Sequence, residues 1–400
     1  MQSKLSQQAA NSGDLIKLDQ LTGWRFIAAF GVVLCHFSEF LFPNQSPIFL
    51  SLWKGMANFV GFFFILSGFI LAYNYQAKMV AGTTTVRSFL VARFARIYPA
   101  LIFSLLVALP AFLYLNLKLH TPAQSLLTYS LSSVLLIKTW LPFASWSGIS
   151  AWNAPTWSIE TEFFFYLCFP FLLRPFSKLS IRSIISLWIA LVGLMIGAAA
   201  SFDVFSPRPG IEPFFGAFEF LHSSPYFCVL EFALGILTFN LARNLPQQTL
   251  SYLRNNSRWI FALLVGSYLG LNLTLPIMSR YHGIPAIVFS SVILLSYTSP
   301  VSLKFLQSPK FLYLGETSYS LYLLHSPVLG LFLLGAKTVG PLAYLKQELP
   351  PIFAISAIAT SFGLAAFCHK FVEVPWRTRI IQKLAPRNQV LVPKNEAKAA

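Results

Sequence analysis

Two ionisable side chains lie within one apolar stretch near the start of the chain. Residues 21–42 read LTGWRFIAAFGVVLCHFSEFLF and contain Arg25 and His36. In a helix, this eleven-residue spacing corresponds to about three turns, so both side chains project from one face, roughly 16 Å apart along the axis. A charged or titratable group in a membrane span is costly and usually faces the bundle interior or a wet cavity. The pair therefore predicts a polar track part-way through a bilayer. The alternative is an arginine that reaches the headgroups and a structural histidine.

A second basic group follows in residues 86–102, VRSFLVARFARIYPALI. Arg93 and Arg96 are three residues apart and share one helical face. Guanidinium groups at this spacing suit a phosphate-rich ligand, because each forms paired, charge-assisted hydrogen bonds to phosphate. Attraction to anionic lipid headgroups explains the same pattern.

Carboxylates open a later apolar stretch, residues 153–173, which reads NAPTWSIETEFFFYLCFPFLL. Glu160 and Glu162 point roughly 200° apart on a helix, so we expect one to face inward and the other the membrane interface. The dipole of a helix N-terminus also favours acidic residues there.

Two further stretches place polar groups near or within apolar segments. GETSYSLYLLHSPV contains His325 with Tyr319 and Tyr322, and HKFVEVPWRTR contains Glu373, which we expect to pair with a loop arginine. His325 is either functional or a hydrogen-bonded structural histidine.

Residues 202–223, FDVFSPRPGIEPFFGAFEFLHS, combine aromatic and acidic side chains. This pattern suits sugar recognition or a loop that rests on the membrane surface. The members that could bind a ligand are Asp203, Glu212, Glu219 and His222.

The composition identifies the class of protein. The 400 residues are 56% hydrophobic and only 10% charged, and the mean hydropathy is +0.64. Soluble domains carry about 25% charged residues, so we predict an all-α polytopic membrane protein. We attribute the net charge of +16 to cytoplasmic loops rather than to nucleic-acid binding. The four cysteines lie in apolar stretches without a CxxC pair, so we expect neither disulfides nor a metal site.

Windows of about 20 apolar residues predict a bundle of about ten membrane spans. We interpret residues 125–143 as a short or re-entrant element, because an eleventh span would invert every later loop. With the N-terminus inside, 21 of the 29 basic residues lie on the cytoplasmic side, a clear positive-inside bias. Both termini are then cytoplasmic, with tails at 1–17 and 384–400, the latter disordered, around a membrane domain at 18–383. The ten windows lie near 21–42, 57–75, 97–117, 156–174, 183–201, 224–242, 258–277, 282–299, 317–336 and 351–371.

Small residues mark one face of the second span, NFVGFFFILSGFILAYNY. Gly61 and Gly68 are seven residues apart, with Ser67 beside the second. Small residues let helices approach closely, so a tight helix contact is expected here. The alternative is space for a thin ligand.

At six points the chain resembles the acyltransferase 3 family of integral membrane O-acyltransferases. The matches occur in the family's order from about residue 18 to 380. Many members carry a C-terminal SGNH esterase-like domain, and residues 1–400 resemble the stand-alone type. The matching segments are Arg25–ten residues–His36, GFFFILSGFIL, ARFARIYP with Arg93 and Arg96, PTWSIETEFFFYL, LGETSYSLYLLH and FVEVPWR.

The resemblance implies transfer of an acyl group, often acetyl, from cytoplasmic acyl-CoA to a sugar hydroxyl. His36 would be a general base or a covalent acyl carrier, and the sequence leaves both open. Arg25 would hold the pantetheine arm or stabilise an oxyanion, and Arg93 and Arg96, with Ser67, would bind acyl-CoA. The resemblance selects Glu162 over Glu160, as a group that orients His36 or the acceptor. Supporting roles fall to Tyr319, His325 and Glu373.

The implied partners are acyl-CoA, a carbohydrate acceptor and membrane lipid in a bacterial inner membrane, with no nucleic acid. Homo-oligomerisation stays open. The alternative function is a transporter or flippase for a glycan or small anionic solute, which would also place arginine and histidine within spans. Transporters often have two related halves, and the Arg25–His36 pattern has no counterpart in the second half of this chain.

Overall fold

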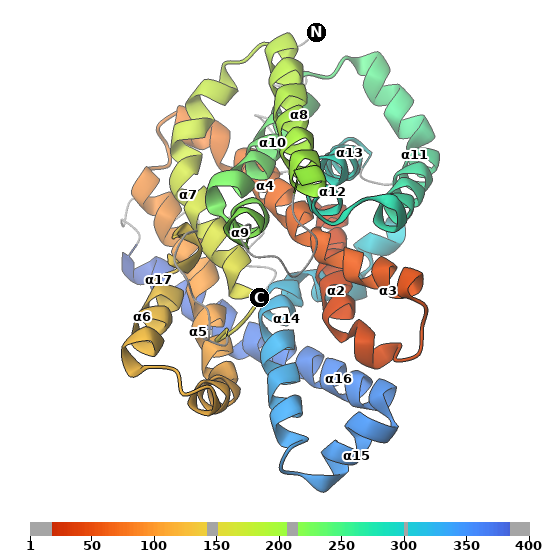
Figure 1. Ribbon diagram of the computed structural model, residues 1–400. Coiled ribbons are helices and arrows are strands. Elements are labelled where there is room, and N and C mark those ends of the chain that lie inside the picture. Colours follow the sequence, from red (N-terminus) through yellow and green to blue (C-terminus); the bar gives the residue numbers. More distant parts are fainter. Residues whose placement is uncertain (1–17, 142–150, 206–214, 300–302, 385–400) are drawn as a thin grey trace.

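The computed structural model describes residues 18–141, 151–205, 215–299 and 303–384, and these residues form a bundle of helices (Figure 1). Each predicted span coincides with one long helix. These helices are α2 (Asp19–Leu41), α4 (Phe59–Val80), α5 (Val86–Lys118), α7 (Thr156–Ser177), α8 (Ile181–Phe205), α10 (Pro225–Asn244), α11 (Gln247–Thr274), α13 (Ile284–Thr298), α14 (Pro309–Gly335) and α16 (Pro350–Cys368).

Within the described residues, eight helical segments are long and apolar enough to cross a membrane. Helices α7 and α11 do not meet these criteria, because α7 carries Glu160, Glu162 and Arg174 and α11 begins with a polar sequence, QQTLSYLRNNSR. The chain is therefore an all-helical polytopic membrane protein. The count of ten spans and the cytoplasmic location of the termini stay predictions.

Shorter elements connect these helices. Helix α6 has only 12 residues, about 18 Å, which is shorter than the roughly 20 residues of a spanning helix and fits the short element expected at 125–143. The predicted tails were residues 1–17 and 384–400; Leu384 is the last residue of α17, and residues 1–17 and 385–400 lie outside the described residues. The short elements are α3 (Pro47–Lys54), η1 (Gly55–Asn58), α6 (Ala123–Val134), η2 (Lys138–Trp140), α9 (Phe215–Ser223), α12 (Ile277–Tyr281), η3 (Lys304–Gln307), α15 (Gly340–Glu348), the π-helix η4 (His369–Glu373) and α17 (Val374–Leu384).

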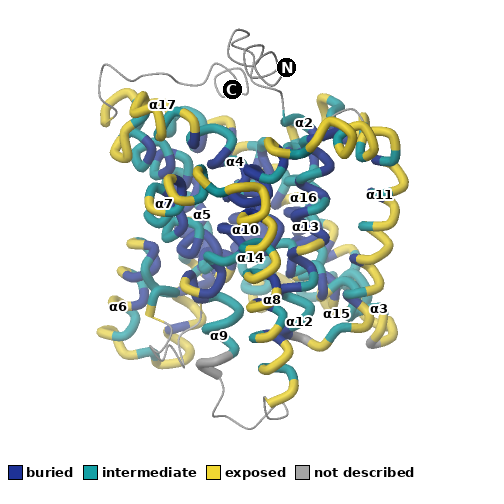
Figure 2. The backbone as a smooth tube through the Cα atoms, turned by 90° about the horizontal axis from the view of Figure 1, so that it is seen from above, coloured by how far each residue is buried: buried dark blue, intermediate teal, exposed yellow. Residues whose placement is uncertain are grey.

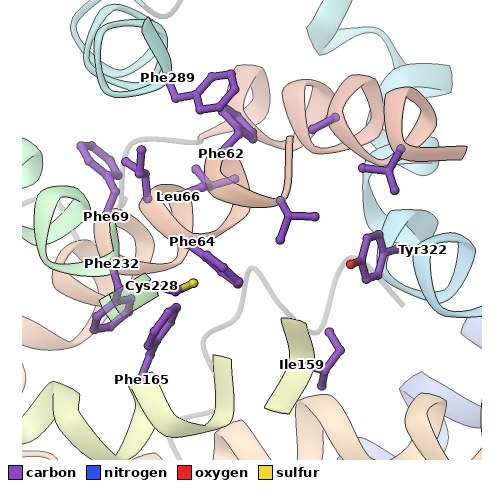
Figure 3. Packing of buried hydrophobic residues seen from close by; sticks show 14 of the residues in the cluster. Phe62, Phe64, Leu66, Phe69, Ile159, Phe165, Cys228, Phe232, Phe289 and Tyr322 are labelled. Carbon is purple, nitrogen blue, oxygen red and sulfur yellow. The ribbon is translucent and has the colours of Figure 1, made fainter. Parts of the chain in front are cut away.

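Helices α4 and α10 lie at the centre of the bundle, where buried residues concentrate (Figure 2). Aromatic side chains fill the space around them, and Phe232 of α10 stacks on Phe165 of α7 at 4.9 Å (Figure 3). The two helices approach closely at Gly68, where a Cβ atom would overlap the carbonyl oxygen of Phe232. Gly235 meets the backbone of Ile65 in the same way. The tight helix contact expected at Gly68 is confirmed.

The two ends of the bundle differ. Helix α17 and the start of α2 lie at one end, whereas α3, α9 and α12 lie at the other (Figure 2). The first and last described helices thus have their outer ends on the same side of the bundle, as an even number of membrane crossings would require. We refer below to the α17 end and the α12 end.

Replacing Gly68 with alanine should destabilise the protein by about 1–3 kcal/mol, because the added methyl group has no space against the α10 backbone. Gly266→Ala is the matched control, since nothing lies within 4 Å of a Cβ at that position. Thermal unfolding of the purified protein in detergent measures both. Equal melting temperatures for the two variants would contradict the contact.

Candidate active site

His36 of α2 and His325 of α14 form a direct hydrogen bond. His36 Nδ1 lies 2.7 Å from His325 Nε2, and the rings stack with centroids 4.9 Å apart. His325 is fully buried, whereas His36 is exposed. One nitrogen must donate and the other accept, so the bond leaves His36 Nε2 available for a substrate.

His36 opens into a cavity of about 470 Å³. Its lining comes from separate parts of the chain, including α3, α9 and α12, so the cavity lies towards the α12 end (Figure 2). In the predicted topology this is the non-cytoplasmic side. The lining includes Glu39, Lys54, Trp157, His222, Tyr281 and Tyr322.

The first turn of α7 and the segment before it fix the position of α14 beside this cavity. Asn153 Nδ2 donates to the carbonyl oxygen of Leu323 at 2.9 Å, and the hydroxyl groups of Ser158 and Tyr322 lie 2.7 Å apart. Both bonds hold α14 at residues that lie within one helical turn of His325. The segment PTWSIETEFFFYL thus contributes the buried hydroxyl group of Ser158, which binds α14, in addition to the carboxylate of Glu162.

Glu162 lies apart from the histidine pair. Its Oε1 accepts hydrogen bonds from Ser67 Oγ at 3.1 Å and from Tyr166 Oη at 2.7 Å. Among the described residues, the hydrogen-bonding partner of the His36 ring is His325 rather than Glu162. Glu162 therefore makes no direct hydrogen bond to His36, and its other expected role, orienting the acceptor, stays a prediction. Ser67 Oγ donates its hydrogen bond to Glu162.

Glu160 is completely buried, and Glu162 is half-buried and bound by Ser67 of α4 and by Tyr166, so neither carboxylate is exposed as one of them was expected to be. Its Oε1 lies 3.5 Å from Lys138 Nζ, and its Oε2 accepts from the backbone N–H of Thr139 at 2.8 Å. Burial alone would lower the pKa of Lys138, but Glu160 and Tyr129 outweigh this effect and raise that pKa. Glu160 therefore attaches η2 to α7.

The three predicted arginines lie towards the α17 end, and each has a different environment. Arg25 is half-buried and makes no hydrogen bond or ion pair within the described part of the chain. Three charged groups act on it electrostatically: Arg96 repels its charge, whereas Glu373 and Glu162 attract it. Arg93 is buried, donates to Tyr75 Oη at 2.9 Å and lies over the Tyr75 ring.

Arg96 pairs with Glu373 at 3.1 Å, so the expected pairing of Glu373 with an arginine is present, but this arginine lies in helix α5 rather than in a loop. The Glu373 carboxylate also accepts from Ser320 Oγ at 2.9 Å and lies 3.2 Å from His369 Nδ1. Tyr319 lies beneath Arg96 and donates to the carbonyl oxygen of Ile97. Tyr319 and Glu373 thus support this arginine.

The 202–223 segment separates into different roles. Asp203 accepts from the backbone N–H groups of Met278 and Ser279 at 2.9 and 2.8 Å, so it stabilises the start of α12. His222 lines the cavity. Glu212 and the side chain of Glu219 lie outside the described residues.

Comparison with known proteins agrees with this arrangement. A family model described as an acyltransferase domain matches residues 18–370. The acyltransferase MdmB of Streptomyces mycarofaciens is 27% identical over 382 residues, which cover 90% of this chain and 92% of the relative. Protein 2 in the picA locus of Rhizobium radiobacter is 34% identical over 152 residues, 36% of this chain and 75% of the relative.

No solved structure matches the chain. The family model spans the histidine pair, the cavity and the three arginines. The chain therefore belongs to the acyltransferase 3 family and is a membrane-bound O-acyltransferase.

Proposed function

We propose that the protein transfers an acyl group, in the first instance acetyl, from cytoplasmic acyl-CoA to a hydroxyl of a sugar or polysaccharide. The observation that carries this proposal is the arrangement along α2. His36 opens into a cavity towards one end, and Arg25 lies about three turns away towards the other. The donor and the acceptor would approach this helix from opposite sides of a bacterial inner membrane, surrounded by lipid.

His36 is suited to be the general base. Its Nε2 would accept the proton of the acceptor hydroxyl, and its Nδ1 would donate to His325, which stabilises the imidazolium that forms. The hydroxyl oxygen bonds to the acyl carbon, the thioester C–S bond breaks, and the proton passes from His36 to the departing CoA thiolate. In the covalent alternative, His36 first takes the acyl group, the thiolate leaves, and the hydroxyl then displaces His36.

Arg25 is the group best placed to bind the donor, because its charge has no partner among the described side chains. A half-buried, unpaired guanidinium is costly without an anion. Arg93 and Arg96 are held by Tyr75 and Glu373, so they would present fixed rather than mobile donors to the CoA phosphates. Ser67 and Glu162 would line the path of the acyl-CoA between these arginines and His36.

The transport alternative has no supporting observation. The comparisons match an acyltransferase domain and a named acyltransferase. Release of free CoA thiol on adding acyl-CoA and acceptor distinguishes the two functions, because a transporter would release none.

His36→Ala should lower acyl transfer at least 100-fold, the usual contribution of a positioned general base. The measurements are release of CoA thiol in membranes and ester-linked acyl groups on cellular glycans by mass spectrometry. His120→Asn is the control, because His120 is an exposed loop histidine with positive φ, which asparagine tolerates. Normal transfer by the His36 variant would remove the general-base and acyl-carrier roles together.

Arg25→Ala should raise the Michaelis constant for acyl-CoA about tenfold or more, since one charge-assisted contact to the donor is lost. Arg258→Ala also removes one positive charge, but from an exposed position on α11, and should leave this constant unchanged. An equal response of the two variants would show that net charge matters rather than a specific contact.

A further inference from the structure

A group of three rings forms part of the cavity lining away from the His36–His325 pair. We call it the aromatic wall: Trp157 of α7, His222 of α9 and Tyr281 of α12. The His222 ring lies 5.1 Å from the Trp157 ring and 4.5 Å from the Tyr281 ring, between centroids. All three side chains line the same cavity as His36.

The His222 imidazole has no hydrogen bond within the part of the chain that the structure describes, although its Nδ1 is buried. The backbone that follows His222, in contrast, is held by hydrogen bonds. Thr161 of α7 donates to the carbonyl oxygen of Ser223 at 3.1 Å, and Ser224 begins α10 as its N-cap. A buried polar atom without a partner costs free energy, so a fixed ring with unused nitrogens is suited to binding a ligand.

A buried ion pair lies behind the aromatic wall. Glu231 of α10 and His282 are 1% and 4% exposed, and His282 Nδ1 lies 3.1 Å from Glu231 Oε1. Glu231 Oε2, His282 Nε2 and His222 Nδ1 are all buried without a described partner, and all three residues line one small cavity next to the large one. Phe227 packs edge-on against His282, which fixes the ring.

Gly61 makes space for this pair. A Cβ atom there would lie 3.0 Å from Glu231 Oε1 and 3.2 Å from Oε2. Gly61 therefore lets the Glu231 carboxylate lie against α4, whereas Gly68 lets the backbone of α10 approach α4. Glu231 and His282 are placed to position His222 and Tyr281, the latter being the residue next to His282 in the chain.

The charges of the lining indicate what the cavity holds. Glu39 and Lys54 form an ion pair with each other at 2.7 Å, so the acidic and basic lining residues offset one another. Ring faces pack against the apolar C–H surface of a sugar, and imidazole nitrogens exchange hydrogen bonds with its hydroxyl groups. A volume of about 470 Å³ is in the ordinary range for a small-molecule site.

We propose that the aromatic wall is the acceptor subsite, that His222 binds a hydroxyl of an uncharged glycoside, and that Glu231 and His282 are positioning residues. This inference rests on the proposed function, because it names how the acceptor is oriented towards His36. It adds a third histidine to His36 and His325, one that binds the acceptor and makes no contact with the donor.

The first test uses the full-length protein in membranes, acetyl-CoA, and the glycan whose ester-linked acetyl groups depend on this protein. His222→Asn should raise the Michaelis constant for that glycan about tenfold, the effect of one lost hydrogen bond, and leave the constant for acetyl-CoA unchanged. His120→Asn should change neither constant. An unchanged acceptor constant in the His222 variant would overturn the subsite.

A second pair of variants tests the positioning residues. Gly61→Ala should raise the acceptor constant severalfold, because its methyl group displaces the Glu231 carboxylate, and Gly266→Ala should not. Adding Glu231→Asp to Gly61→Ala shortens the carboxylate by one methylene and should restore part of the loss. A change in the acetyl-CoA constant alone, or no difference between the two alanine variants, would contradict the positioning role.

The failures of the two proposals are distinguishable. If the wild-type protein releases no CoA thiol with any glycan, the proposed function fails and the subsite fails with it. If the wild-type protein transfers acetyl groups and the His222 and Gly61 variants keep its acceptor constant, the subsite alone fails.

Discussion

The Arg96–Glu373 ion pair connects three parts of the bundle on which the candidate site depends. Glu373 is fully buried at the end of the π-helix η4 and binds α5 through Arg96 and α14 through Ser320. Removing one member of a buried pair typically costs about 3–5 kcal/mol, because the other charge is left unpaired. Helix α14 carries Tyr319, Tyr322 and His325, so this interaction also fixes the orientation of the histidine pair.

The cost of an unpaired buried charge also distinguishes structural from functional groups elsewhere in the bundle. Lys138 and Glu160 neutralise each other, and Glu162 is bound by Ser67 and Tyr166. Against this background, the polar groups left without partners are informative. Among the described residues these include Arg25 at the α17 end and His222 Nδ1 at the α12 end. Other buried atoms, such as Arg93 Nε and Ser290 Oγ, also lack a described partner. A missing partner is therefore informative where the residue also lines a cavity, as His222 does.

Much of the fold could be predicted from the sequence, because span length and apolar character are local properties. All ten predicted windows coincide with long helices. The described part of the intervening segment forms a short helix and a 3-10 turn, in agreement with the short element expected there. The motif residues Arg25, His36, Glu162 and Glu373 all lie in the interior or on the cavity. The tight contact at Gly68 could also be predicted, because it depends on a local property: small residues seven positions apart lie on one helical face.

The pairing of groups across the bundle could not be predicted in this way. His36 and His325 are 289 residues apart, and nothing in either stretch states which helix faces the other. The angle of about 200° between Glu160 and Glu162 was correct, yet it did not imply that one is exposed, because Lys138 covers Glu160. Glu231 and His282 were missed, although Glu231 lies within the predicted span 224–242 and His282 begins the predicted span 282–299. An ionisable residue inside a span was a local signal of the same kind as Arg25 and His36. A second local signal was Gly61, seven residues from a glycine that packs on backbone. A small residue on a helix face indicates that something approaches closely, and only the packed structure shows that here it is a carboxylate.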